Sequence, residues 1–295
     1  MPIAPSSPLS TVAKFAFERL RQVTLPILLL LASTVCPAAI SFVQQNNAVP
    51  ATPQSSVSVT YTAAQAAGDT NVVAVGWNDS TSSTTSVTDS KGNVYTLAIG
   101  PTRQSGVHSQ AIYVAKNVVA AAANANTVTV SFNTAAPYPD VRILSYRGLD
   151  TVSPVEAAVG AVGTGTTTNS GLLTRTNAIG LLFGAAYLST HVNAAGSGFT
   201  SRVITAPDGD IAEDQMVTAA GTYSATAAMA SGNWVMQLVA LKASGSLLAA
   251  AAPTFTPAPG TYASVQTVHL ADTSSGASIY YTLDGSTPTT SSAVY

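Results

Sequence analysis

Residues 72–77 read VVAVGW, and residues 57–62 read VSVTYT. The first run is continuously apolar and rich in β-branched residues, which suits a central strand. The second alternates apolar with polar residues, which is the period of a half-buried strand. Both patterns predict β-sheet rather than helix.

Similar short runs fill the chain between residues 42 and 242, separated by Gly, Asn, Asp, Ser and Thr. They recur every roughly ten to fifteen residues, which is typical of an antiparallel β-sandwich of jelly-roll or Ig-like type. Residues 87–97 predict a β-hairpin, with polar turn formers between two β-rich arms. The Ala-rich pieces, such as 118–125, lack the apolar stripe of an amphipathic helix. No internal repeat at a fixed period is visible, so residues 41–243 are predicted to form one all-β sandwich domain.

The composition excludes several classes of protein. Of 295 residues, 46% are hydrophobic and only 8% are charged, whereas an average soluble domain is about one quarter charged. The formal net charge of −2 lacks the basic footprint of a nucleic-acid-binding protein. The high hydrophobicity also argues against intrinsic disorder.

The N-terminal segment predicts export. Lys14, Arg19 and Arg21 precede the apolar run 23–32, and small residues follow up to Ala39. This order is that of a secretory signal peptide over residues 1–39, and the apolar run is too short to span a bilayer. We therefore expect a secreted or cell-surface protein with no transmembrane span after cleavage, and with Cys36 removed. An uncleaved anchor and lipid attachment at Cys36 are the alternatives.

A second module follows a linker at 244–252. Residues 253–262 read PTFTPAPGTY, and residues 279–289 read IYYTLDGSTPT. Residues 253–295 thereby resemble the chitobiase/β-hexosaminidase C-terminal module, which is Ig-like, and the match stops before the family's later strands. The resemblance implies a secreted or surface protein of a multidomain bacterial type. It does not imply hexosaminidase activity, because that chemistry belongs to a separate domain of the family.

The densest group of charges lies between residues 208 and 214. Asp208, Asp210, Glu213 and Asp214 could supply hard oxygen ligands to a calcium ion, the only cofactor that the sequence suggests. Asp208 or Asp210 with Glu213 could alternatively act as the catalytic pair of a β-sandwich glycoside hydrolase. The third interpretation is a solvated loop neutralised by Arg202 or Arg175.

Aromatic residues at predicted strand ends could form a sugar platform. Trp77 with Asp79, Tyr138 and Tyr187 could stack on pyranose rings while neighbouring polar groups bind hydroxyls. The alternative for Trp77 is a core position, which we also expect for Trp234. The three histidines, at 108, 191 and 269, show no metal-ligand spacing and are interpreted as exposed loop residues.

These observations favour a non-catalytic module over an enzyme. The first hypothesis is a secreted or cell-surface β-sandwich that serves adhesion or binds a polysaccharide or surface glycan, within a multidomain protein. The second is a secreted glycoside hydrolase that uses the carboxylates of residues 208–214. The third is a structural spacer without a ligand.

Overall fold

The computed structural model describes residues 39–245, 253–258, 260, 262–264, 266–272, 279–286, 288–289 and 291–295. Residues up to 245 belong to one compact unit and those from 253 onward to another. The predicted signal peptide lies outside the described residues except for Ala39, and so does the predicted linker beyond residue 245. All the regular elements among the described residues are strands, so the all-β prediction is confirmed. No helix in this part of the chain is long and apolar enough to cross a membrane.

The first half of the larger unit is an antiparallel sandwich of two sheets. The five-stranded sheet has the order β1-β8-β3-β6-β5, and the three-stranded sheet has the order β2-β7-β4. Its strands are β1 (Ser41–Ala48), β2 (Gln54–Tyr61), β3 (Thr70–Trp77), β4 (Thr84–Asp89), β5 (Tyr95–Gln104), β6 (His108–Ala115), β7 (Asn126–Ala136) and β8 (Asp140–Arg147).

The second half repeats this order. Its large sheet runs β9-β16-β11-β14-β13, with β12 beside the start of β16, and β10 pairs with β15 in a small outer sheet. Its strands are β9 (Val155–Thr167), β10 (Leu173–Arg175), β11 (Gly180–Leu188), β12 (Val192–Ala195), β13 (Thr200–Ile204), β14 (Ile211–Val217), β15 (Gly221–Tyr223) and β16 (Ala227–Lys242). Replacing each strand number n of the first large sheet by n + 8 gives the second.

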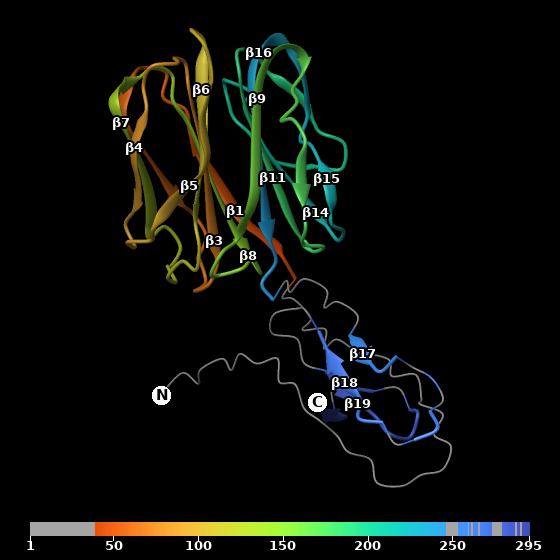
Figure 1. Ribbon diagram of the computed structural model, residues 1–295. Helices are drawn as coiled ribbons and strands as arrows, with labels where there is room; N and C mark the ends of the chain where they lie inside the picture. Colours follow the sequence, from red (N-terminus) through yellow and green to blue (C-terminus); the bar gives the residue numbers. More distant parts are fainter. Residues whose placement is uncertain are drawn as a thin grey trace. The chain divides into compact units, whose positions relative to one another are not determined.

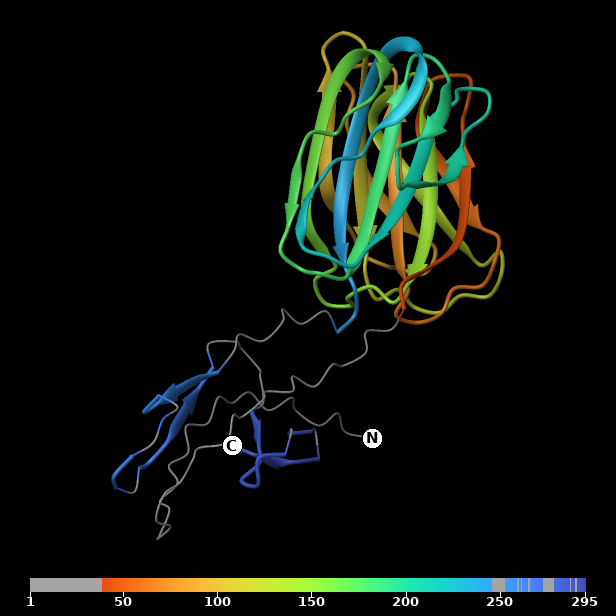
Figure 2. The ribbon, with the colours of Figure 1, turned by 90° about the vertical axis from the view of Figure 1, so that its right-hand side faces the viewer.

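The two large sheets pack face to face, so the layers lie side by side in Figure 1, and Figure 2 shows the second large sheet from its outer side. The edge strand β5 packs against β9, and β1 lies against β13. Each edge strand of one half thus meets the opposite edge strand of the other, as an approximate two-fold arrangement requires. The predicted single sandwich is therefore two sandwiches with one topology, although the sequence shows no fixed period.

Three apolar layers hold this stack together. On β3, Val73, Val75 and Trp77 face the small sheet, while Val72 and Ala74 face the second half. Such double burial explains the continuous apolar run. Strand β11 is its counterpart, with Leu181 and Phe183 between the large sheets and Leu182, Ala186 and Leu188 beneath the outer layer.

The predicted hairpin over residues 87–97 is wrong. Both strands form, but β4 pairs with β7 and β5 pairs with β6, in different sheets. Asp89 organises the link by accepting hydrogen bonds from the backbone N–H groups of Lys91 and Asn93, both at 3.0 Å. A connection of this length can cross the ~10 Å between packed sheets, and turn-forming residues alone do not say whether it does.

The smaller unit has two strand pairs among its described residues. Strand β17 (Thr254–Thr256) pairs with β18 (His269–Ala271), and β19 (Tyr280–Tyr281) pairs with β20 (Ala293–Val294). Both pairs are antiparallel, which agrees with a β module in this region.

Candidate functional site

An open hollow of about 570 Å³ lies at one end of the larger unit, where loops of both halves meet. Strands β1 and β3 begin at the end of the sheet where β8 ends, because Ser41 pairs with Arg147 and Thr70 with Tyr146. The hollow lies at the opposite end of these strands. We call it the junction hollow. It is lined by Asn78, Gly106, Val107, His108, Pro137, Tyr138, Tyr187, Leu188, Ser189, Thr190, His191, Pro207 and Asp208.

Tyr187 joins the two halves at the floor of the junction hollow. Its hydroxyl donates a 2.8 Å hydrogen bond to the carbonyl oxygen of Tyr138. Its ring fills the space left by Gly76, because a Cβ atom at residue 76 would lie 1.9 Å from Tyr187 Cδ2. A side chain at that position would therefore push the two large sheets apart.

His108 packs edge-to-face on Tyr187, with ring centroids 5.4 Å apart and planes at 83°. It is buried, and neither ring nitrogen has a hydrogen-bond partner among the residues that the structure describes. Burial lowers the pKa of His108 to about 4, so the imidazole is neutral at physiological pH. A neutral imidazole has one donor and one acceptor nitrogen, and both are buried here without a partner among the described residues. The expectation of an exposed loop histidine is wrong here; it holds for His191, which is exposed.

The rim supplies an aromatic ring and a carboxylate. Tyr138 is 50% exposed and has φ of +44°, an uncommon conformation for a bulky residue that its neighbours must hold in place. Across the hollow, His191 lies against Gly209, where a Cβ atom would come within 2.5 Å of His191 Nδ1. Burial and the nearby Asp140 raise the pKa of Asp208, and His191 opposes this shift.

Beneath the hollow lies a buried ionic group that sequence reasoning missed. Arg142 Nε is 2.8 Å from Asp140 Oδ1, and both side chains are fully buried. The guanidinium also donates to the carbonyl oxygens of Ala186 and Ile211 in the second half. Burial and the neighbouring Asp140 raise the pKa of Asp210 well above its ordinary value. Asp210 therefore keeps its proton, which avoids a second buried negative charge beside Asp140.

A glutamine pair extends this polar contact between the large sheets. Gln110 Nε2 donates to the side-chain oxygen of Gln237 at 3.2 Å and to the carbonyl oxygen of Ala185 at 2.8 Å. Gln237 Nε2 in turn donates to the carbonyl oxygen of Gln110 at 2.9 Å. Arg142 donates to Gln110 Oε1, which makes the polar contact continuous.

The structure does not bring the four carboxylates of the predicted calcium site together. Asp208 lies at the junction hollow, and Asp210 lies between the large sheets. Glu213 is buried on the other face of β14, where it accepts a hydrogen bond from the Gly196 N–H at 2.9 Å. Asp214 is bound by Arg202 at 2.7 Å. Side chains of a strand alternate between faces, which separates Asp210 from Glu213. Over the described ranges, no three His, Cys, Asp or Glu residues are grouped to hold a metal ion.

The predicted solvated loop is also wrong for residues 211–214, because they form part of strand β14. Of the two arginines that the sequence offers, Arg202 pairs with Asp214, whereas Arg175 pairs with Glu156.

Trp77 is fully buried in the first sandwich. Its ring packs edge-to-face on Phe132 at 5.6 Å, and the Arg103 guanidinium lies 5.9 Å from its centroid. It therefore offers no exposed face to a sugar. Asp79 accepts hydrogen bonds from the backbone N–H groups of Thr81 and Ser82 in its own loop, at 2.7 and 2.6 Å. Of the four residues predicted for the sugar platform, the hollow unites Tyr138 and Tyr187.

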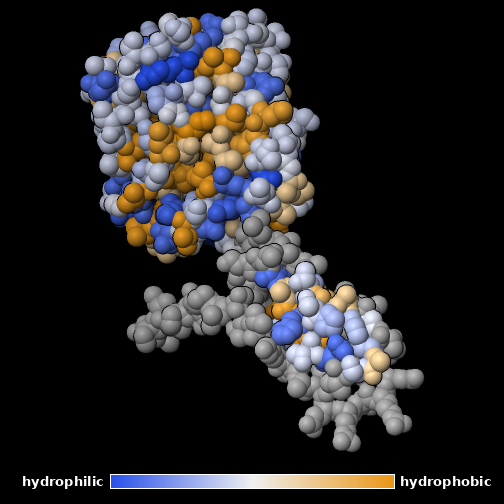
Figure 3. All heavy atoms as spheres, in the orientation of Figure 1, coloured by the Kyte–Doolittle hydropathy of each residue, from blue (hydrophilic) through white to orange (hydrophobic). Residues whose placement is uncertain are grey.

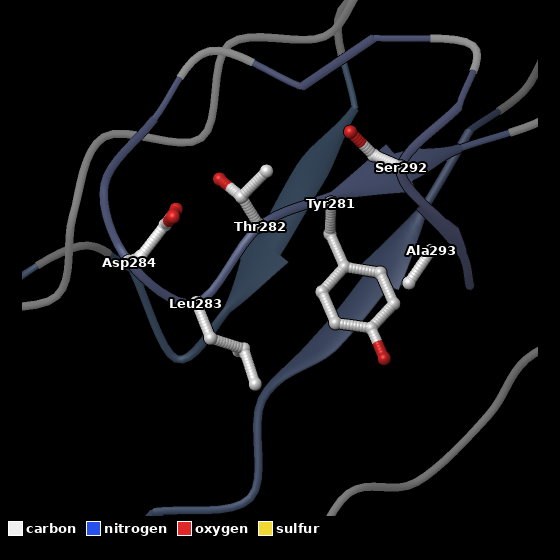
Figure 4. A pocket seen from close by; sticks show the side chains of 6 residues that line it. All are labelled: Tyr281, Thr282, Leu283, Asp284, Ser292 and Ala293. Carbon is white, nitrogen blue, oxygen red and sulfur yellow. The ribbon is translucent and has the colours of Figure 1, made fainter.

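The smaller unit has a shallow pocket of about 490 Å³. It is lined by Tyr281, Thr282, Leu283, Asp284, Ser292 and Ala293. Tyr281 and Leu283 extend to one side of the β19–β20 pair, and Thr282 and Ser292 to the other (Figure 4). The Asp284 carboxylate accepts hydrogen bonds from Ser286 and orders the turn after β19.

Comparison with known proteins gives one match. Residues 257–295 match the family model of the chitobiase/β-hexosaminidase C-terminal domain, which confirms the resemblance found in the sequence. No curated protein and no solved structure matches the chain. The family evidence thus covers the C-terminal module, while the two packed sandwiches rest on their own geometry.

Proposed function

We propose that this chain is a secreted or cell-surface carbohydrate-binding β-sandwich protein without catalytic activity, and that the junction hollow holds the glycan. The observation that carries the proposal is the exposed ring of Tyr138 beside buried and half-buried polar groups at the meeting point of two sandwiches. A carbohydrate-related module on the same chain supports it.

The chemistry of the hollow suits a neutral sugar. A pyranose has an apolar face that stacks on an aromatic ring, and hydroxyl groups that both donate and accept hydrogen bonds. Tyr138 supplies the ring. Asp208 supplies an acceptor at the rim, and the unpaired ring nitrogens of His108 lie buried in the lining of the hollow.

The rigid setting of these groups favours binding. Tyr138 is held by the Tyr187 hydrogen bond and by a 2.9 Å bond from the Asn78 N–H to the carbonyl oxygen of Pro137. A platform fixed before the ligand arrives loses little conformational freedom on binding. If the bound glycan belongs to a cell surface, the protein acts in adhesion.

Glycan-array screening of the full chain, followed by calorimetric titration of the best ligand, tests the proposal. We expect Tyr138→Asn to weaken binding at least tenfold, since asparagine tolerates positive φ but has no ring. Tyr262→Asn makes the same change in the other unit and should leave the affinity unchanged. Absence of binding to any glycan would refute the function, and an unchanged affinity of Tyr138→Asn would refute the site.

A further inference from the structure

The edge strand β9 differs from the other edge strands of the larger unit. It pairs with β16 on one side only, and its register is unbroken from Ala157–Ala240 to Gly165–Gly232. Every second residue of such a strand turns its backbone N–H and C=O groups away from its partner. None of its thirteen residues is fully buried, and among the described strands only β16 pairs with it.

The other long edges carry devices that prevent pairing. Register breaks interrupt β1 after Phe42, β13 after Ser201, and β5 after both Leu97 and Ile99. The outer strands β2 and β4 are interrupted in the same way. Natural proteins protect edges with bulges, prolines and charges, because a flat exposed edge pairs with another chain.

Strand β9 has a register break near each end, after Val155 and after Gly165, but none over the nine residues from Ala157 to Gly165. Residues 157–167 read AAVGAVGTGTT, without proline or charge. Its one charged residue, Glu156, is bound by Arg175 at 3.0 Å. Beside Val162, the Gln104 side chain donates to the carbonyl oxygen of Gly163 at 3.1 Å, and it would turn aside when a second strand pairs there.

Comparison with β1, the counterpart of β9 in the first half, sharpens the contrast. Gln44 of β1 donates to the carbonyl oxygen of Ala63 and Asn46 to that of Thr60, both at 2.8 Å, so side chains tie β1 to the chain that follows it. Strand β9 carries Ala, Gly, Val and Thr at its centre, which cannot reach out in this way.

Apolar side chains extend the open edge. Val162 of β9 is 40% exposed, and Leu97 of the adjacent β5 is 45% exposed. Figure 3 shows hydrophobic residues in a band across the face on which β5 and β9 lie. A partner strand would therefore gain backbone hydrogen bonds and cover apolar surface together.

We propose that β9 pairs antiparallel with β9 of a second copy of this chain, which joins the β9-β16-β11-β14-β13 sheets of the two copies into one continuous sheet across a two-fold axis. An antiparallel pair centred near Val162 brings no like charges together, because each Glu156 then lies opposite the uncharged end of the other strand. Its small side chains allow close approach. The formal net charge of −2 gives little repulsion between copies.

Sedimentation equilibrium of the full chain tests this pairing. We expect a dimer for the unaltered chain and for Val162→Thr, a neutral β-branched control. Val162→Lys and Val162→Glu should each raise the dimer dissociation constant at least tenfold, because like charges meet at the axis. An equimolar mixture of the two should restore the dimer.

Thermal melting checks that each variant folds. If a Val162 variant does not fold, Thr164→Lys, on an exposed residue of the same strand, takes its place in the test. A chain that stays monomeric at roughly 100 µM, where even micromolar interfaces are occupied, would overturn the proposal. So would a dimer that survives the charged variants, or a mixture that stays monomeric.

Discussion

Glu213 makes the stability of the larger unit depend on pH. Burial raises the pKa of Glu213 to about 7, against the opposing hydrogen bond from Gly196. The carboxyl faces Gly184 and Ala225, and its Oε1 atom has no partner among the described residues. The environment therefore favours the protonated acid.

The sign and size of the effect follow from linkage. Below about pH 4.5 Glu213 is protonated in both the folded and the unfolded chain, so it imposes no penalty. As the pH rises towards 7, the unfolded chain releases the proton first and the folded state loses stability. A shift from 4.5 to about 7, at about 1.4 kcal/mol per pKa unit, gives a loss of about 3 kcal/mol by pH 8.

Glu213→Gln removes this loss, because the amide resembles the protonated acid. Urea unfolding at a series of pH values should show the variant gaining about 3 kcal/mol over the unaltered chain between pH 4 and pH 8. Parallel stability curves for the two proteins would refute the reasoning.

Glu156→Gln is the matched control with the opposite sign. Burial opposes ionisation of Glu156, but hydrogen bonds from Asn177, Thr176 and Arg175 outweigh it and lower the pKa to about 2. Its stabilising contribution is present above about pH 4.5 and is lost as the pH falls towards 2. The variant should therefore be less stable than the unaltered chain at pH 8, with a constant difference between pH 5 and 8.

Three further predictions concern the junction between the halves. Burial of His108 lowers its pKa to about 4, so stability falls by about 3 kcal/mol as the pH drops from 6.5 to 4; urea unfolding should show that His108→Gln loses this part of the acid sensitivity. Gly76→Ala places a methyl group inside the Tyr187 ring and should cost about 3 kcal/mol or more, seen as a lower melting temperature. Arg142→Met leaves a buried carboxylate without its counter-ion and should cost about 3–5 kcal/mol, whereas Arg147→Met, at a half-exposed ion pair, should cost under about 1 kcal/mol.

The sequence predicted those parts of the fold that depend on local pattern. The apolar run at 72–77 became the doubly buried β3, and the alternating run at 57–62 became most of β2. It could not predict which sheet each strand joins, and β4 and β5 were wrongly joined for this reason. The sequence also did not reveal that the second half repeats the topology of the first. Two segments can share one pattern of buried and exposed positions without sharing a recognisable sequence repeat.

The site shows the same division between local and long-range information. The sequence pattern predicts Tyr138 and Tyr187 as strand-end aromatics, and the structure places both at the junction hollow. His108 and Gly76 gave no local signal, because their roles depend on a ring supplied from a segment about 80 to 110 residues away. The acidic cluster misled in the opposite way. Asp208 and Asp210 precede β14, and Glu213 and Asp214 lie on opposite faces of it, so nearness in sequence did not bring the four carboxylates together.

The low charge content links the stability of the unit to its open edge. Eight basic residues follow residue 40, and four of them, Arg142, Arg147, Arg175 and Arg202, form ion pairs with carboxylates within the larger unit. Arg142 also donates to the carbonyl oxygen of Ile211 in the other large sheet, and the Arg202–Asp214 pair connects β13 with β14. Because half of these basic residues form ion pairs within the unit, few remain to place a charge on an exposed edge strand. The uncharged β9 edge is therefore the place where this composition leaves the folded unit open to a second chain.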